Sequence, residues 1–183
     1  MAKPFIGIKR LWYGPELTAA QATSLTNGAA VKTLVQGETF TEIKNVHQGT
    51  WGYTHDDPDV TDYINELTGQ PYYRDKESLG ARTIAFTIGV YDFATKAALQ
   101  GGSVITDTNV AKGWKSSGAL ENVEKCIVAM TKTGNYIIFS DASLIAKGDQ
   151  KEKNIGLGVT AVCMESDVDG VEAEYMIEGG DEW

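Results

Sequence analysis

The sequence predicts a mainly β fold: an antiparallel β-sandwich or partly open barrel with one short α-helix. Three observations predict it. Segments with alternating apolar and polar residues recur along the chain, turn residues join many of them as hairpins, and only one segment has the caps of a helix. The 183 residues include 20 Gly and 4 Pro, so Gly, Asn and Asp are expected to supply the turns. A chain of this length fits one domain, which we expect to span 1–183.

The first strand is predicted at 3–13, where apolar residues lead into Gly14-Pro15. Residues 16–37 are rich in Ala, Thr, Ser and Gly and have few apolar residues to bury. We expect this segment to be an extended loop or a hairpin arm that turns at Asn27-Gly28, and therefore a candidate contact arm. Disorder in the isolated subunit is the alternative.

Two more strands are predicted at 40–46 and 48–54. The acidic stretch 55–63 follows, and its Pro58 is incompatible with a central strand. The stretch lacks the Gly and Glu spacing of an EF-hand calcium loop, so a solvated loop is expected instead.

A strand and a helix are predicted next to each other in the middle of the chain. Residues 82–90 place bulky apolar side chains at every second position, which indicates a strand. Asp92 is a good N-cap for a helix at 93–99, and Gly101-Gly102 offers a left-handed stop. A turn-rich connection is expected at 113–119.

The C-terminal part is predicted to consist of strands joined by hairpins, at 125–132, 136–139, 154–164 and 172–177. Thr133-Gly134-Asn135 turns the first of these strands into the second, and Asp169-Gly170 turns the third into the last. In the last strand, we expect Ala173, Tyr175 and Ile177 to point inward and the glutamates to face water. Residues 178–183 read as a flexible acidic tail.

Two strand faces carry only small residues, which would allow another layer to pack closely. The candidates for that layer are this subunit's own helix, another sheet or the backbone of a neighbouring subunit. The two faces are Thr83, Ala85, Thr87 and Gly89, and Gly156, Gly158 and Thr160.

The charge of the chain and the placement of its cysteines argue against nucleic-acid binding and against a metal or redox site. Lys and Arg number 16 against 25 Asp and Glu, a net charge of −9 with a pI near 4.7, and no basic cluster offers phosphates a binding surface. The acidity serves either solubility or a function. Cys126 and Cys163 lack the spacing of a metal or redox site, so two buried thiols are expected, with a disulfide as the alternative. No signal peptide or membrane span is expected.

The sequence contains no candidate catalytic residues. His47 and His55 belong to no metal-binding or nucleophile motif. The carboxylate pairs Asp56-Asp57 and Asp167/Asp169 lie in polar stretches, which does not favour general acid work. We therefore expect no enzyme activity and no catalytic, cofactor-binding or metal-binding residues.

Several segments, taken in order and with their spacing, resemble the bacteriophage tail tube (major tail) proteins, whose architecture type VI secretion tube proteins share. The resemblance covers most of 39–177. The chain departs from the family pattern in its excursion after Gly14 and in its short acidic ending. The segments that carry the resemblance are 46–53, 83–92, Leu99 with Gly101-Gly102, 125–132, 133–144 and 154–164.

The resemblance implies a subunit that closes into a ring, by analogy a hexamer, with rings stacked into a tube. Phage DNA would pass through without specific binding, and other virion tail proteins would be partners. The protein would be made in the bacterial cytoplasm and would reside in the virion, with no membrane contact. The alternative from the residues alone is a carbohydrate-binding or adhesion β-sandwich, with a stacking platform formed by Trp51, Tyr53, Tyr72 and Tyr73.

Overall fold

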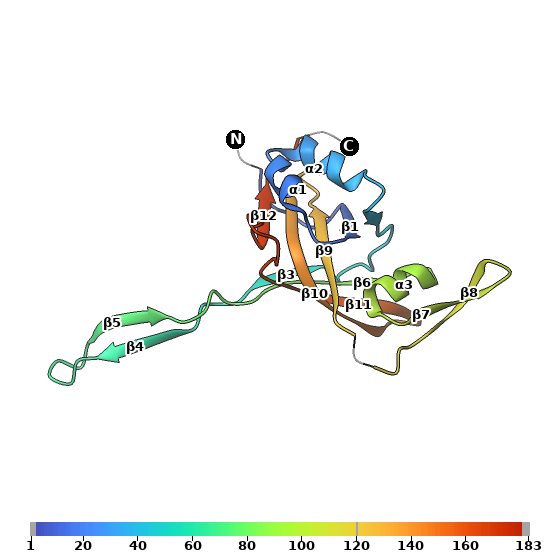
Figure 1. Ribbon diagram of the computed structural model, residues 1–183. Helices are drawn as coiled ribbons and strands as arrows, with labels where there is room; N and C mark the ends of the chain where they lie inside the picture. The colour runs from blue at the N-terminus through green and yellow to red at the C-terminus, as the bar shows by residue number, and fades with distance from the viewer. Residues whose placement is uncertain (1–2, 120, 181–183) are drawn as a thin grey trace.

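The computed structural model describes residues 3–119 and 121–180, and its architecture is mainly β with antiparallel sheets, as predicted (Figure 1). The main sheet curls around a core without closing into a barrel. The described strands are β1 (Arg10–Gly14), β2 (Thr41–Glu42), β3 (Gly52–His55), β4 (Val60–Ile64), β5 (Pro71–Lys76), β6 (Arg82–Ile88), β7 (Ser103–Asp107), β8 (Val110–Lys115), β9 (Val123–Met130), β10 (Tyr136–Lys151), β11 (Asn154–Cys163) and β12 (Glu174–Ile177). The described helices are α1 (Ala19–Ser24), α2 (Gly28–Val35) and α3 (Phe93–Gln100).

The main sheet is organised by β10, which is far longer than the strand predicted at 136–139. Its order is β2-β1-β9-β10-β11-β6-β3, and β12 also pairs with β10. The first part of β10 lies between β9 and β12, and its second part, from Ala142, pairs with β11. A β-bulge between Phe139 and Ala142 separates the two parts.

The last strand does not form the expected hairpin with its predecessor. β12 pairs with Tyr136–Phe139 of β10, whereas β11 pairs with Ala142–Lys151. Because β9 occupies the other edge of β10, β11 and β12 follow each other along one edge of the same strand. The turn at Asp169-Gly170 therefore moves the chain from one half of β10 to the other.

One hydrophobic core joins the two ends of the curled sheet. Side chains from β1 and β9 pack with side chains from β6 and β11, and Leu99 of α3 adds to the same core. The turn at Thr133-Gly134-Asn135 between β9 and β10 is confirmed, with Gly134 at φ 93°. The fully buried members with the largest side chains are Leu11, Ile84, Phe86, Ile88, Leu99, Ile127, Phe139 and Leu157.

The prediction for 16–37 was wrong: this segment forms α1 and α2 rather than a loop or a hairpin arm. Thr18 caps α1 in a capping box with Gln21. Asn27 caps α2 by accepting from the Ala30 N–H at 3.0 Å, so Asn27-Gly28 begins a helix instead of turning a hairpin. The helices cover the outer face of β1, β9 and the first part of β10, with a second core of Trp12, Leu17, Leu25, Val31, Val35, Phe40, Cys126, Val128, Met130, Tyr136 and Ile138.

The predicted helix at 93–99 is confirmed as α3, with its caps. The Asp92 carboxylate accepts from the Thr95 N–H at 2.6 Å, and Gly101 ends the helix at φ 79°. We expected this helix to be one candidate cover for the small-residue face of Ala85 and its neighbours. Helix α3 packs instead on the opposite face of β6. Its Leu99 lies in the same core as Ile84, whose side chain points away from the face of Ala85.

Three predicted strands near the N-terminus are shorter than expected. The first regular strand is β1 rather than 3–13, although residues before it are held to the β9–β10 turn by a bond from the Lys132 N–H to the Ile6 carbonyl at 2.9 Å. The strands expected at 40–46 and 48–54 are reduced to β2 and β3. Single backbone bonds to neighbouring strands continue beyond these ends, from the Ile43 N–H to the Leu11 carbonyl of β1 at 2.8 Å and from the His47 N–H to the Thr87 carbonyl of β6 at 2.7 Å.

Both cysteines are free thiols, Cys126 buried and Cys163 half-buried. At the C-terminal end, Gly179 is buried and its N–H donates to the Asn135 side chain, so the beginning of the acidic tail is packed. The rest of that tail, 181–183, lies outside the described residues. Among the described helices, none combines the length and the apolar character needed to cross a bilayer.

The packing of α1 and α2 on the sheet predicts how a substitution in the second core changes stability. Leu17→Ala should lower the free energy of unfolding by about 2–5 kcal/mol, because Leu17 is 0% exposed in the second core and its loss leaves a cavity. Leu67→Ala is the matched control, since Leu67 is 95% exposed and should change that free energy by less than about 0.5 kcal/mol. Denaturant unfolding measures both variants. Equal losses would show that the helical segment does not pack as described.

Candidate functional site

Two hairpins project from the sheet and form the most distinctive surface of the molecule (Figure 1). β4 and β5 form one two-stranded sheet, and β7 and β8 form another. We call residues 56–79 the tyrosine arm and 103–115 the second arm. The expectations of a solvated loop at 55–63 and a turn-rich connection at 113–119 were therefore wrong over β4 and the end of β8. Pro58 does not prevent the strand because it lies before β4 begins.

The tyrosine arm is a continuation of the β3–β6 pair. The last pair of that ladder is His55 with Arg82, and the arm's own ladder begins with Val60 and Lys76. Between the two ladders, backbone bonds from Asp56 N–H to the Ala81 carbonyl and from Glu77 N–H to the Asp59 carbonyl, each 2.9 Å, keep the strands together. The arm is thus rooted in the sheet through both of its strands.

A glycine at the root permits this continuation. Gly80 has φ +75°, and a Cβ at that position would lie 2.0 Å from the Asp56 carbonyl oxygen. Only a residue without a side chain fits there, because any Cβ would overlap the opposite strand.

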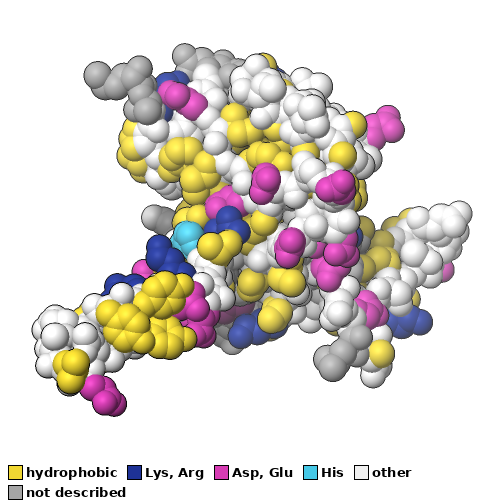
Figure 2. Space-filling view, turned by 60° about the vertical axis from the view of Figure 1, so that its left-hand side comes forward, with side chains coloured by type: hydrophobic (Ala, Val, Ile, Leu, Met, Phe, Trp, Pro, Cys, Tyr) yellow, Lys and Arg dark blue, Asp and Glu magenta, His cyan; other side chains and the backbone are white. Residues whose placement is uncertain are grey.

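The tyrosine arm exposes apolar side chains that no core covers. Tyr63 and Tyr73 face each other across the ladder with ring centroids 5.7 Å apart, and Tyr72 is 70% exposed. Figure 2 shows hydrophobic side chains gathered on this projection. A two-stranded ribbon has no interior of its own, and soluble monomers rarely leave such patches uncovered. The other large apolar side chains exposed on the arm are Val60, Ile64, Leu67 and Leu79.

The tyrosine arm also carries much of the molecule's charge. It holds seven Asp or Glu and two Lys or Arg, a net charge of −5 out of −9 for the chain. Asp62 and Arg74 form a two-bond pair across the strands, at 2.5 and 2.7 Å, and this hydrogen bonding lowers the pKa of Asp62. The pair is exposed and contributes little to stability. Two other carboxylates of the arm accept hydrogen bonds within it, Glu77 from the Thr61 hydroxyl at 2.6 Å and Asp59 from the Ser78 hydroxyl at 3.2 Å.

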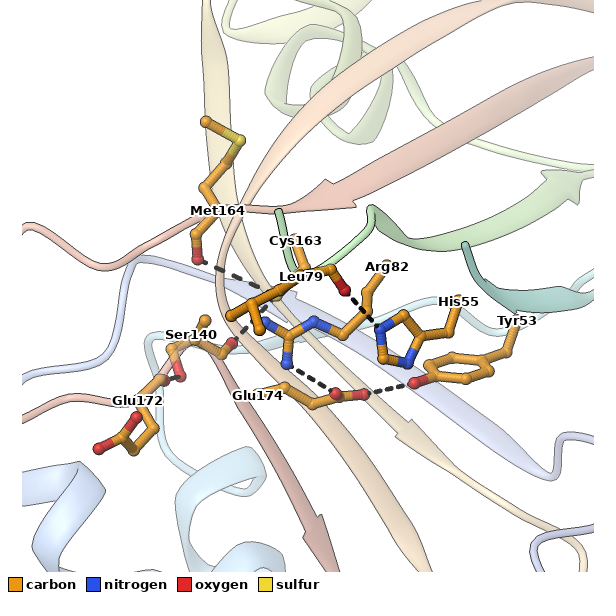
Figure 3. A network of polar contacts seen from close by, with 10 residues as sticks. Tyr53, His55, Leu79, Arg82, Ser140, Cys163, Met164, Glu172 and Glu174 are labelled. Carbon is orange, nitrogen blue, oxygen red and sulfur yellow. Dashed lines mark hydrogen bonds and ion pairs between the residues drawn. The ribbon is translucent and has the colours of Figure 1, made fainter. Parts of the chain in front are cut away.

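A polar network fixes the root of the tyrosine arm (Figure 3). Glu174 of β12 accepts from the Tyr53 hydroxyl at 2.8 Å and from the Arg82 guanidinium at 3.0 Å. The expectation that the glutamates of this strand face water is therefore wrong for Glu174, whose side chain is largely buried. His55 adds a contact from its Nε2 to the Leu79 carbonyl oxygen at 3.1 Å. The network ties β3, β6 and β12 where the arm leaves the sheet.

Burial and the hydrogen bond to Glu174 raise the pKa of Tyr53 to about 12. Burial acts first, because it disfavours the charged phenolate, and the adjacent carboxylate disfavours it further. The phenol is therefore held in its neutral, hydrogen-bond-donating form.

The second arm is anchored on α3. The Trp114 indole N–H donates to the Gly101 carbonyl oxygen at 2.9 Å. Lys96 Nζ lies 4.2 Å from the centre of the Trp114 ring, a cation–π contact between helix and arm. Sequence alone placed Trp114 in a connection and gave no sign of this role.

The structure separates the groups proposed for binding or catalysis. Trp51 and Tyr53 pack against the core of the sheet, whereas Tyr72 and Tyr73 lie on the arm, so the four do not form one platform. The carboxylate pairs at 56–57 and 167/169 are exposed. Within residues 3–119 and 121–180, no group of three or more His, Cys, Asp or Glu is arranged to hold a metal ion.

Comparison with models of known protein families found no match, and comparison with curated proteins found none either. The exposed tyrosine arm and its rigid root are therefore the features from which we infer function.

The root network makes a prediction for alkaline pH. The folded-state pKa of Tyr53, about 12, lies above the ordinary tyrosine value of about 10. Its contribution to stability is therefore complete below about pH 10 and is lost as pH rises through about 12. Tyr53→Phe should cost about 1 kcal/mol of unfolding free energy near neutral pH, by loss of the hydrogen bond.

Between about pH 8 and about pH 11, the unfolding free energy of Tyr53→Phe should fall less than that of the wild-type protein. Tyr72→Phe is the control, because that side chain is exposed on the arm. Denaturant unfolding at both pH values measures the difference. An identical alkaline loss in the wild-type protein and Tyr53→Phe would contradict the assigned network.

Proposed function

We propose that this protein is a non-enzymatic structural subunit of the tail tube type, which assembles into rings that stack as a conduit for DNA. The observation that carries the proposal is the tyrosine arm, a rooted ribbon with exposed apolar side chains directed away from its own core. The order of sequence segments that resembles the tail tube family supports the same function.

The partner of the tyrosine arm is another copy of the chain. Each large apolar side chain left in water forgoes about 1.5–3 kcal/mol of burial. The arm extends away from the sheet (Figure 1), so a second molecule must cover it. A contact between two different surfaces of identical subunits is head-to-tail, and such contacts close into rings when the rotation allows.

An open strand edge supports the same assembly. β9 pairs with β10 only as far as Leu144, and among the described strands none continues on that side of residues 145–151. Unpaired edges of this kind invite pairing with another chain unless they are covered. A neighbouring subunit in the ring would cover this edge.

The charge distribution suits passage of DNA without binding. A net charge of −9 per subunit repels phosphates. By analogy with the family, the ring is a hexamer, the remaining partners are other virion tail proteins, and the protein resides in the virion after synthesis in the bacterial cytoplasm. A type VI secretion tube subunit would share this architecture.

Assembly should depend on the tyrosine arm. The triple variant Leu67→Ser, Tyr72→Ser, Tyr73→Ser should remain folded but need at least about a tenfold higher concentration to form rings or tubes, since each tenfold corresponds to about 1.4 kcal/mol. Light scattering and negative-stain electron microscopy measure assembly, and circular dichroism checks folding.

Val90→Ser is the control for the arm variant, because Val90 is 77% exposed but lies outside the arm. It should assemble like the wild-type protein. A wild-type protein that stays monomeric at high concentration, with no rings or tubes, would refute the proposed function.

A further inference from the structure

A buried carboxyl group with one unpaired oxygen lies at the bulge of β10. Asp141 is 8% exposed, and its Oδ1 is a buried oxygen with no hydrogen-bond partner. Buried polar atoms are almost always paired, so an orphan of this kind calls for a physical reason. The residue lies where β10 changes its partner from β12 to β11.

The backbone holds Asp141 in this position. The Asp141 carbonyl accepts from the Met164 N–H at 3.0 Å, at the end of β11. The preceding residue, Ser140, donates its N–H to the Ala173 carbonyl at 3.0 Å, just before β12. The bulge thus holds the backbone of β10 to the segments that end β11 and precede β12.

The charged groups that act most strongly on Asp141 are all acidic. They are Glu16 from the connection between β1 and α1, Glu124 from β9 and Asp167 from the loop after β11. Glu16 is itself fixed, because it accepts from the Ser166 hydroxyl at 2.6 Å and from the Asp167 N–H at 3.1 Å. Negative charge therefore surrounds the orphaned oxygen from three elements.

The remaining titratable groups nearby do not offset this charge. The two thiols, Cys126 on β9 and Cys163 on β11, feel the Asp141 charge, and their own pKa values are raised, mainly by burial. Lys125 adjoins Glu124 but pairs with Ala142, and successive side chains of a strand point to opposite faces. Its ammonium group therefore lies on the other side of the sheet from Glu124.

We propose that Asp141 is a proton-binding site built into the bend of β10, and that taking up a proton from solvent tightens the junction of β11, β12 and the β1–α1 connection. A neutral carboxylic acid is far less costly to bury than a carboxylate beside other carboxylates. It also gains an O–H that can donate to one of the neighbouring carboxylates. The ligand is the proton, and the site does not depend on assembly.

The direction of the pH effect follows from the same geometry. Burial, then repulsion by Glu16 and Glu124, raises the pKa of Asp141 to about 6, against an ordinary value of about 3.9. A raised folded-state pKa gives stability that is complete below about pH 3.9 and is lost as pH rises through about 6. The subunit should therefore be tighter in mildly acidic solution than at neutral pH.

Asp141→Asn tests the proposal in the full chain, because asparagine has the same shape and no charge. The unfolding equilibrium constant of the wild-type protein, divided by that of the variant, should rise about tenfold between about pH 5 and about pH 7.5. Asp169→Asn is the matched control, since Asp169 is exposed and is not among the acidic groups that act on Asp141, and it should keep the wild-type pH dependence.

The second measurement is an NMR titration of the Asp141 carboxyl carbon in the wild-type protein. If Asp141→Asn does not fold, this titration alone tests the proton-binding site. A midpoint near 6 together with the pH-dependent ratio supports the proton-binding site. A midpoint near the ordinary value of about 3.9, or parallel pH profiles for the wild-type protein and Asp141→Asn, overturns it.

Discussion

The continuous strand β10 is the constraint on which the rest of the structure depends. It pairs with β9 and β12 before its bulge and with β11 after it, so a single strand belongs to both halves of the curled sheet. A bulge adds one residue and bends the strand. Strands β1 and β6, each next to an end strand of the sheet, contribute to one core on the two sides of this bend.

The same sheet gives the tyrosine arm its rigidity. A free two-stranded ribbon is marginally stable in water, but this one extends a ladder that is already buried at its base. Glu174 reaches from β12 to Tyr53 and Arg82 on the two strands that lead into the arm. The arm is therefore presented in a defined direction, which lowers the entropy lost when a second molecule docks on it.

Two largely buried acids show how the environment decides the role of a carboxylate. Glu174 is paired with a guanidinium and a phenol, so its charge holds three strands together. Asp141 has an unpaired oxygen and acidic neighbours, so its charge opposes the fold around it. Glu174 lies on β12 opposite Phe139 of β10, and Asp141 lies two residues further along β10, in the bulge. The first makes the sheet rigid at the root of the arm, and the second makes its bend sensitive to protons.

Local patterns in the sequence determined the β class, the strand at 82–88, the capped helix α3 and the hairpin turn at 133–135, because caps, turns and period-two alternation act between near neighbours. The spacing of Val31, Leu34 and Val35 also carried a helical signal, which the abundance of small residues obscured. Only the tertiary structure decided that β10 continues past a polar Ser140-Asp141 step, that β12 joins β10, and that an acidic stretch forms an arm. These outcomes depend on strands far apart in the chain, whose pairing satisfies backbone groups and buries charges that sequence alone leaves unassigned.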